Sequence, residues 1–363
     1  MYRPYKESIL EKDRGLMRAP LNHERLASGA QTKWMKCLIG LSSAIALSAT
    51  WGLSASFAQD ATAAYPTRDI TIVCPFGPGG PPDAVARMIA AGLSERLGRT
   101  VIVENRPGAS TALASRTVAR AAPDGYTLYS IDISFAVTPH IASNLDTNPF
   151  KDFKPIGLAA KSVFTLVASP TLGVSTLEGF IKLTRAKGQE IQIGHTGVGT
   201  TPYLAAITFA RSTGVKPLLV PYRAVTDATN NVIGGHIAAV FSAAGTAIGV
   251  GDKAKILGVT GEKRLAALPN VPTFQESGVK MAGFENGTWY GLVAPAGTPD
   301  AIVTKINSAL KETANDKNLA AKLITSGIEL SASTPQEFGD FIRAQYGYWG
   351  ETLRAAGVEP EPK

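Results

Sequence analysis

Cysteine and histidine are scarce in this chain of 363 residues, which holds two Cys and four His. Cys37 falls in an N-terminal leader, so Cys74 is the single Cys of the expected mature chain, which excludes a disulfide framework and a cysteine-based metal site. His140, His195 and His236 each stand alone, with no metal-ligand spacing and no adjacent carboxylate. We therefore expect no metal and no cofactor, and we expect each of these His to be a surface or hydrogen-bonded residue.

The motifs of several enzyme classes are also absent. No Gly-Lys-Ser/Thr marks a P-loop, and Pro82 stands where a dinucleotide-binding turn would have its third Gly. The segment 108–112, Gly-Ala-Ser-Thr-Ala, departs from the Gly-x-Ser-x-Gly elbow of hydrolases. No acid/base pair stands out either, so we expect no catalytic residues and no enzyme, with a secreted α/β hydrolase as a distant alternative.

The first 58 residues have the layout of a secretory signal peptide. Lys33 and Lys36 precede the uncharged stretch 37–57, and the segment 56–58, Ser-Phe-Ala, has small residues at both positions that specify cleavage. A membrane anchor is the alternative, but the many Ser, Thr, Gly and Ala of the stretch disfavour it. We expect export and cleavage near Ala58, with Met1 or Met35 as the start.

Excess charge of one sign is nearly absent once the leader is removed. The chain has 36 Lys/Arg and 29 Asp/Glu, of which the leader holds eight and four, so 28 basic and 25 acidic residues remain. The resulting net charge of about +3, without a basic stripe interleaved with aromatics, predicts no binding of nucleic acid.

What the chain does have is a regular alternation of expected strands and helices, which predicts an α/β fold with parallel strands joined by helical crossovers. About 305 mature residues are enough for two domains. Strands are expected at 70–74, 101–104, 126–130, 164–168, 191–194, 218–221, 237–241, 255–259 and 291–294, and helices at 83–97, 111–121, 176–187, 201–213, 226–234, 299–314, 317–326 and 335–356.

Two strand-to-helix loops are rich in Gly, and each is a candidate anion site. The loop 75–82 follows the first strand, with Asp83 as the expected helix N-cap, and the loop 195–200 precedes a helix that Thr200 or Thr201 can cap. Gly permits close approach of a ligand, and a helix N-terminus offers free N–H groups and a positive dipole end. Two such ends facing across a cleft would hold a small dianion.

An ordered set of motifs resembles the Bug family, the periplasmic solute receptors of tripartite tricarboxylate transporters. The resemblance spans 65–358. It is carried by the segments 73–83, 103–109, 123–128, 197–200, 221–222, 258–260, 269–278 and 289–299, and by the final 356–357.

The resemblance implies a two-domain, Venus-flytrap receptor of the type II periplasmic binding class, with a ligand cleft between two doubly wound sheets. The chain would cross between domains near Ala168 and near Thr288, giving a first domain of 65–167 plus 289–358 and a second of 168–288. It also implies a periplasmic monomer that binds a small carboxylate and delivers it to the membrane subunits of the transporter. A ligand sensor of the same fold that signals to a membrane receptor is the alternative.

The expected ligand contacts combine the two loops with pocket positions that the family suggests. Where the family commonly has Asp, this chain has Ala238, which makes simple amino-acid ligands less expected. The expected binding residues are Phe76, Gly77, Pro78, Gly79, Gly80, Pro81, Asp83, Ser134, Thr196, Gly197, Gly199, Thr200, Thr201, Tyr222 and Ala238.

Overall fold

The structure is a computed structural model that describes residues 64–143, 145–285, 287–324, 326–358 and 360. The expected signal peptide and its cleavage site lie outside these residues. In the described part of the chain, no helix is both long and apolar enough to cross a bilayer.

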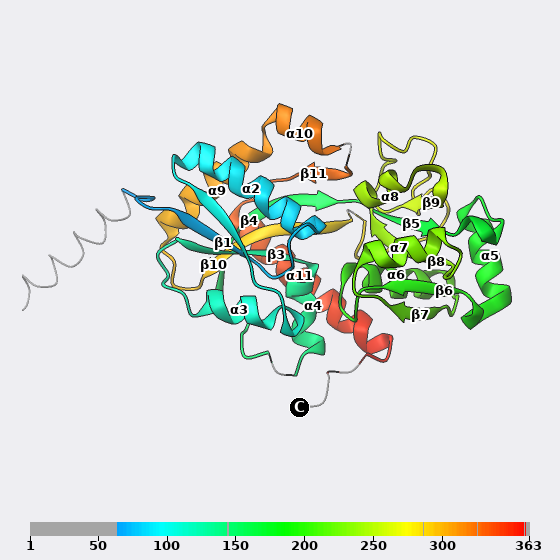
Figure 1. Ribbon diagram of the computed structural model, residues 1–363. Helices are drawn as coiled ribbons and strands as arrows, with labels where there is room; N and C mark the ends of the chain where they lie inside the picture. The colour runs from blue at the N-terminus through cyan, green and yellow to red at the C-terminus, as the bar shows by residue number, and fades with distance from the viewer. Residues whose placement is uncertain (1–63, 144, 286, 325, 359, 361–363) are drawn as a thin grey trace, which may run out of the picture. The chain divides into compact units, whose positions relative to one another are not determined.

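The strands form two sheets (Figure 1). The six-stranded sheet has the order β11 (Ile328–Leu330), β4 (Phe153–Ser162), β10 (Thr288–Pro295), β3 (Thr127–Asp132), β1 (Ile70–Cys74) and β2 (Val101–Asn105). The five-stranded sheet has the order β7 (Leu218–Pro221), β6 (Gln192–His195), β8 (Ala239–Ala243), β5 (Phe164–Ala168) and β9 (Lys255–Val259).

Both sheets contain the same parallel core. In the first, β1 pairs in parallel with β2 and β3, and in the second, β6 pairs in parallel with β7 and β8. In the first sheet, β10 lies antiparallel to β3, and in the second, β5 lies antiparallel to β8. Parallel neighbours need helical crossovers, and this is why strand and helix signals alternate along the sequence.

Helices cover both faces of each sheet, which confirms the expected doubly wound α/β class (Figure 1). On the six-stranded sheet, α2 and α9 pack against one face and α3, α4 and α11 against the other. On the five-stranded sheet, α5 and α6 pack on one face and α7 and α8 on the other. The helices are α2 (Pro81–Leu97), α3 (Ala112–Ala119), α4 (Ile133–Ile141), α5 (Leu177–Lys187), α6 (Thr201–Thr213), α7 (Val225–Ile233), α8 (Ala244–Val250), α9 (Asp300–Ala314), α10 (Lys317–Ile324) and α11 (Pro335–Ala355).

The chain passes from the first sheet to the second at Val163, between β4 and β5, and returns between β9 and β10. The two passages touch at Gly287, where a Cβ would lie 2.0 Å from the Ser162 carbonyl oxygen and where φ is +72°. The hydroxyls of Ser162 and Thr288, which are opposite each other on β4 and β10, are buried without a hydrogen-bond partner. Only glycine fits this close contact between the two passages.

Four elements were not expected from the sequence, and the start of a fifth differs from the expectation. The strands β4 and β11 and the helices α4 and α8 were not expected, and the first helix begins at Pro81 with Gly80 as its N-cap. The expectation that Asp83 is the N-cap is therefore wrong, because the two Pro fit the first helical turn and Asp83 lies within it.

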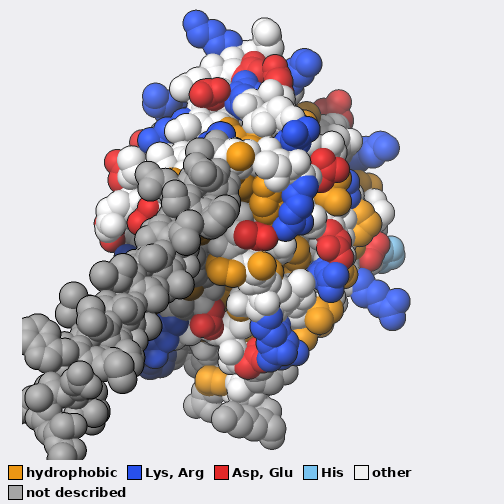
Figure 2. All heavy atoms as spheres, turned by 90° about the vertical axis from the view of Figure 1, so that its left-hand side faces the viewer, with side chains coloured by type: hydrophobic (Ala, Val, Ile, Leu, Met, Phe, Trp, Pro, Cys, Tyr) orange, Lys and Arg blue, Asp and Glu red, His pale blue; other side chains and the backbone are white. Residues whose placement is uncertain are grey.

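The surface shows no gathering of one charge on the face drawn in Figure 2, where Lys/Arg and Asp/Glu side chains are interspersed with hydrophobic ones. Several of the acidic side chains pair with a basic one, as Asp146 does with Arg116 at 2.8 Å. This distribution fits the small net charge expected after removal of the leader.

Candidate functional site

The first loop, between β1 and α2, is fixed from behind by Asp83. This buried carboxylate accepts hydrogen bonds from the N–H of Gly79 at 2.9 Å, from Arg87 Nε at 3.0 Å and from Asn105 Nδ2 at 2.7 Å. Asn105 also donates to the Phe76 carbonyl at 2.9 Å. Burial by itself would raise the pKa of Asp83, but the bonds from Arg87, Gly79 and Asn105 lower it below its ordinary value. Asp83 therefore holds the loop and has its acceptors engaged within the protein.

The outward side of the same loop offers backbone donors. Pro78, Pro81 and Pro82 have no N–H. The N–H groups of Gly77 and Gly80 have no hydrogen-bond partner among the described residues. A Cβ added at Gly77 or Gly80 would meet no protein atom closer than 3.7 Å, so the space above the backbone is open. This arrangement at the N-terminus of α2 suits an anion.

The second loop, between β6 and α6, is held by its own side chains. The Thr200 hydroxyl donates to the Gly197 carbonyl at 2.7 Å and accepts from the Thr196 hydroxyl at 3.1 Å. The Gly197 N–H donates to His195 Nδ1 at 3.0 Å. These contacts engage the N–H of Gly197 and the hydroxyl proton of Thr200, while Thr201 Oγ1 has no hydrogen-bond partner among the described residues. The hydroxyl of Thr201, the first residue of α6, is thus not engaged by these contacts.

His195 is a buried, hydrogen-bonded residue, as expected for the His residues of this chain. Burial lowers its pKa below the ordinary value, so the ring is neutral at neutral pH. The ring packs against Tyr203 with centroids 5.1 Å apart. His195 therefore orders the second loop through the Gly197 N–H.

The second loop lies against α4. A Cβ on Gly199, where φ is +81°, would come within 2.4 Å of the Ile141 side chain and 3.2 Å of that of Val137. The same helix begins at Ile133, directly after Asp132 at the end of β3. Through α4, the structure connects the carboxyl edge of the first sheet with the second loop.

The remaining expected residues divide into two groups. Ser134 lies at the carboxyl edge of the first sheet, where its N–H and hydroxyl both donate to Asp132 Oδ1. Tyr222 lies at the carboxyl edge of the second sheet, and its N–H donates to the His195 carbonyl at 2.7 Å. Ala238 does not lie there. It precedes β8, and its N–H donates to the carbonyl of Gln192, at the opposite end of β6 from the loop.

Asp132 is the functional candidate that sequence reasoning missed. It ends β3 and caps α4, its side chain is 5 % exposed, and burial raises its pKa to about 6 despite the bonds from Ser134. The available signal was an acidic residue two positions after the expected strand 126–130, at the edge where parallel strands of open α/β sheets present their ligands.

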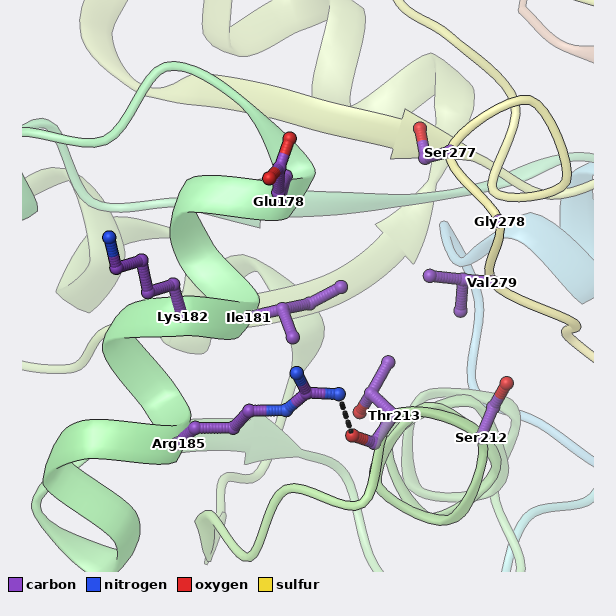
Figure 3. A pocket seen from close by; sticks show the side chains of 9 residues that line it. All are labelled: Glu178, Ile181, Lys182, Arg185, Ser212, Thr213, Ser277, Gly278 and Val279. Carbon is purple, nitrogen blue, oxygen red and sulfur yellow. Dashed lines mark hydrogen bonds between the residues drawn. The ribbon is translucent and has the colours of Figure 1, made fainter.

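Two surface hollows lie elsewhere. One, of about 380 Å³, is lined by α5, the end of α6 and the segment 277–279, and in it Arg185 donates to the Thr213 carbonyl at 2.9 Å (Figure 3). Thr213 ends α6, about 18 Å along the helix from the second loop. The other hollow lies around 94–100, at the far end of α2. Neither contains an expected binding residue.

Metal and thiolate chemistry find no support in the described part of the chain. It contains no group of three or more His, Cys, Asp or Glu that could hold a metal ion. Cys74 is buried, and burial raises the pKa of its thiol to about 11, so the thiol stays protonated.

Comparison with known proteins identifies the family. The model described as "Tripartite tricarboxylate transporter family receptor" matches residues 85–358, about three quarters of the chain. The chain belongs to the tripartite tricarboxylate transporter receptor family. This confirms the resemblance stated from the sequence motifs.

Solved structures agree with the assignment. The periplasmic binding protein BugD is 31% identical with a TM-score of 0.72, and covers 82% of this chain and 100% of its own. Rpa4515 of Rhodopseudomonas palustris, solved with adipate, is 29% identical with a TM-score of 0.75 over 82% of this chain and 100% of its own. MatC of the same organism, solved with bound malate, is 29% identical with a TM-score of 0.70 over 80% of this chain and 100% of its own. The family and these neighbours are substrate-binding proteins, which confirms the expectation that this chain is not an enzyme.

Proposed function

We propose that this protein captures a small carboxylate in the periplasm and delivers it to the membrane subunits of a tripartite transporter. The observation that carries the proposal is that the N–H groups of Gly77 and Gly80, at the N-terminus of α2, have no partner among the described residues and lie on a loop whose outer side is open. Adipate and malate in two neighbours of this fold support a carboxylate as the ligand. A charge buried on closure needs several donors to replace its water, and helix N-termini provide them without a fixed cation.

The proposed site has two sides. On one side, the ligand meets the N–H groups of Gly77 and Gly80, with Asp83 holding the loop from behind. On the other, it meets the start of α6, where Thr201 offers its hydroxyl and Thr200 keeps the loop in shape. The remaining residues of the proposed site line the space around the ligand or form the first loop. Those around the ligand are Thr196, Gly197, Gly199, Ser134 and Tyr222, and those of the first loop are Phe76, Pro78, Gly79 and Pro81.

We also propose a division into two domains, based on which sheet each strand belongs to. The strands from 70 to 162 and from 288 to 330 belong to the first domain, and those from 164 to 259 belong to the second. Because β5 pairs with β8 and β9 of the second sheet, we place the first crossing at Val163, slightly earlier than the crossing near Ala168 that the family resemblance implied. Closure around the ligand would then be a hinge motion at the two passages between the sheets.

The test is a thermal-shift screen of the purified protein against mono-, di- and tricarboxylates, because a ligand that binds the folded state alone raises the melting temperature. Gly80→Val should then reduce binding of the acid that gives the largest shift, since Gly80 has ordinary dihedral angles and its Cβ points into open space. Gly347→Val, at an equally open position on α11, is the matched control and should bind as the unmodified protein does. A screen in which no carboxylate raises the melting temperature would refute the proposal.

Export to the periplasm has its own test. Protein recovered from the periplasm of a Gram-negative host should begin near Gln59 and should be monomeric in light scattering. A native membrane fraction that retains residues 35–58 uncleaved would contradict export and cleavage.

A further inference from the structure

Asp132 lies at the edge from which the first loop leaves its strand. Because β1 and β3 are parallel, with Val73 beside Tyr129, the continuation of β1 brings Phe76 level with Asp132. On the other side of β3, the residue opposite Asp132 is Tyr290 of β10. Both side chains are buried, Asp132 with 5% and Tyr290 with 3% of its surface exposed.

The two carboxylate oxygens of Asp132 differ in their partners. Oδ1 accepts hydrogen bonds from the N–H and the hydroxyl of Ser134, whereas Oδ2 accepts none within the described residues. The Tyr290 hydroxyl likewise makes no hydrogen bond with any described residue. Within the described residues, the fully buried side-chain oxygens that lack a partner belong to Ser162, Thr208 and Thr288. Asp132 Oδ2 and the Tyr290 hydroxyl are not among them, so each keeps a small solvent-accessible surface. An acceptor and a hydroxyl group are thus left open beside the first loop.

Among the described residues, no cation compensates the charge of Asp132. The ionisable groups that face it are Cys74, Tyr129 and Tyr290, and none of them is basic. Asp83, by contrast, is paired with Arg87 at 3.0 Å. A buried carboxylate without a partner is costly, so a donor supplied from outside the protein would stabilise it.

We propose that the ligand is a carboxylate that also carries a hydrogen-bond donor, an ammonium or a hydroxyl group, and that Asp132 Oδ2 accepts from this donor. The inference rests on the proposed function and adds the ligand class. The ligand carboxylate meets the N–H groups of Gly77 and Gly80, and the donor group meets Asp132. It also replaces the expectation drawn from Ala238, which lies at the other edge of its sheet.

The test is isothermal titration calorimetry with matched acids that differ in one substituent. Two series serve: succinate, malate and aspartate, and adipate, 2-hydroxyadipate and 2-aminoadipate. A hydrogen bond to a charged group corresponds to about tenfold or more in affinity, so the substituted acids should bind at least about tenfold more tightly than the plain acid of their series. The ammonium and hydroxyl members show which donor the site prefers.

Asp132→Asn is the decisive variant, because Asn still caps a helix N-terminus but places no carboxylate in the site. The preference for the substituted acids should disappear, while the plain acid binds as well as before or better. Asp132→Ser, which also caps, serves if the Asn variant does not fold. Asp146→Asn removes an exposed carboxylate elsewhere and should leave the preference unchanged.

The outcomes separate this inference from the proposed function. If plain acids bind as tightly as substituted ones, or if Asp132→Asn keeps the preference, the inference is wrong and carboxylate capture stands. If Asp132→Asn weakens all acids equally, Asp132 serves the loop and does not select the ligand, which also overturns the inference. If no carboxylate binds in these series or in the wider thermal-shift screen, both fail together.

Discussion

Replacing Asp132 with Asn should stabilise the unliganded protein at alkaline pH and have little effect at acid pH. Burial raises the pKa of this carboxyl from its ordinary value of 3.8 to about 6, and none of the described residues places a cation beside it. A carboxyl with a raised pKa binds its proton more tightly in the folded state than in the unfolded state. Ionisation therefore costs stability, beginning as the pH rises above the unfolded-state pKa and reaching its full size above about pH 6.

The size of the effect follows from the difference between the two pKa values. A difference of about 2 pKa units at about 1.4 kcal/mol per unit gives about 3 kcal/mol of destabilisation in the unmodified protein at neutral and alkaline pH. Asp132→Asn has no charge to bury and keeps a helix cap, so it should recover most of this free energy.

Urea unfolding near pH 4 and near pH 8 measures the effect. The free energy of unfolding of the variant minus that of the unmodified protein should be larger near pH 8 by about 2 to 3 kcal/mol. Asp146→Asn is a control of opposite sign. The hydrogen bond from Arg116 lowers the pKa of Asp146, so its contribution to stability is present above the unfolded-state pKa and that variant should lose stability near pH 8. If Asp132→Asn changes stability equally at both pH values, Asp132 is not an uncompensated buried charge and the reasoning fails.

Three further substitutions probe the hinge, the fold and the loop. Gly287→Ala should lower the free energy of unfolding by at least about 2 kcal/mol, because its Cβ would collide with the Ser162 carbonyl and φ is positive. The control Gly278→Ala, where φ is positive but the space is open, should lose only about 1 kcal/mol. Equal losses of the two variants in urea unfolding would refute the close contact at Gly287. Thr334→Ala removes the capping box of α11 and should lose about 1 kcal/mol in the same assay, and no loss would show that the cap is not needed. Asp83→Asn should reduce carboxylate affinity in calorimetry because it loosens the first loop, and unchanged affinity would contradict its positioning role.

The parts of the fold that the sequence predicted well are those with short-range signals. The bounds of β1, β5, β7, β9 and α6 match the expected ranges, because Gly and Pro mark the turns and the helix starts around them. In α6, Pro202 occupies the first turn after the cap at Thr200, as its fixed φ favours.

The missed elements depend on tertiary contacts. The strand β4 contains Pro155 and Gly157, which read as breaks, but β4 is held between β10 and β11. Across the ladder, Gly291 lies where a Cβ would be 2.2 Å from the Phe338 ring and 2.8 Å from the Gly157 carbonyl. Gly291 lets α11 pack closely on the sheet, and Gly157, whose Cβ would lie 2.7 Å from the Asn307 side chain, does the same for α9. Only the folded structure reveals these reasons for the two glycines. Similarly, α4 contains Pro139 in an apolar run that has no helical periodicity in the sequence.

The candidate site shows the same division. The composition of the sequence was enough to locate the two loops, but it did not reveal in which direction each side chain points. Asp83 was expected to face the ligand but instead faces Gly79, Arg87 and Asn105 behind the loop. Ala238 was misplaced because its position depends on the parallel register of β6 and β8, which no local pattern encodes.

Backbone donors determine the sign of the ligand charge but not which ligand binds. Every non-proline residue carries an N–H, so a helix N-terminus recognises an anion whatever the rest of that anion looks like. Selection among anions must then come from side chains that reach the same edge. At the carboxyl edge of the first sheet, Asp83 pairs with Arg87, whereas Asp132 has one carboxylate oxygen without a hydrogen-bond partner, and no cation beside it, in the part of the chain that the structure describes. A receptor that holds an anion with its backbone and keeps such a carboxylate nearby disfavours acids that lack a donor, and the cost of that unpaired charge in the empty site is what the right ligand would relieve.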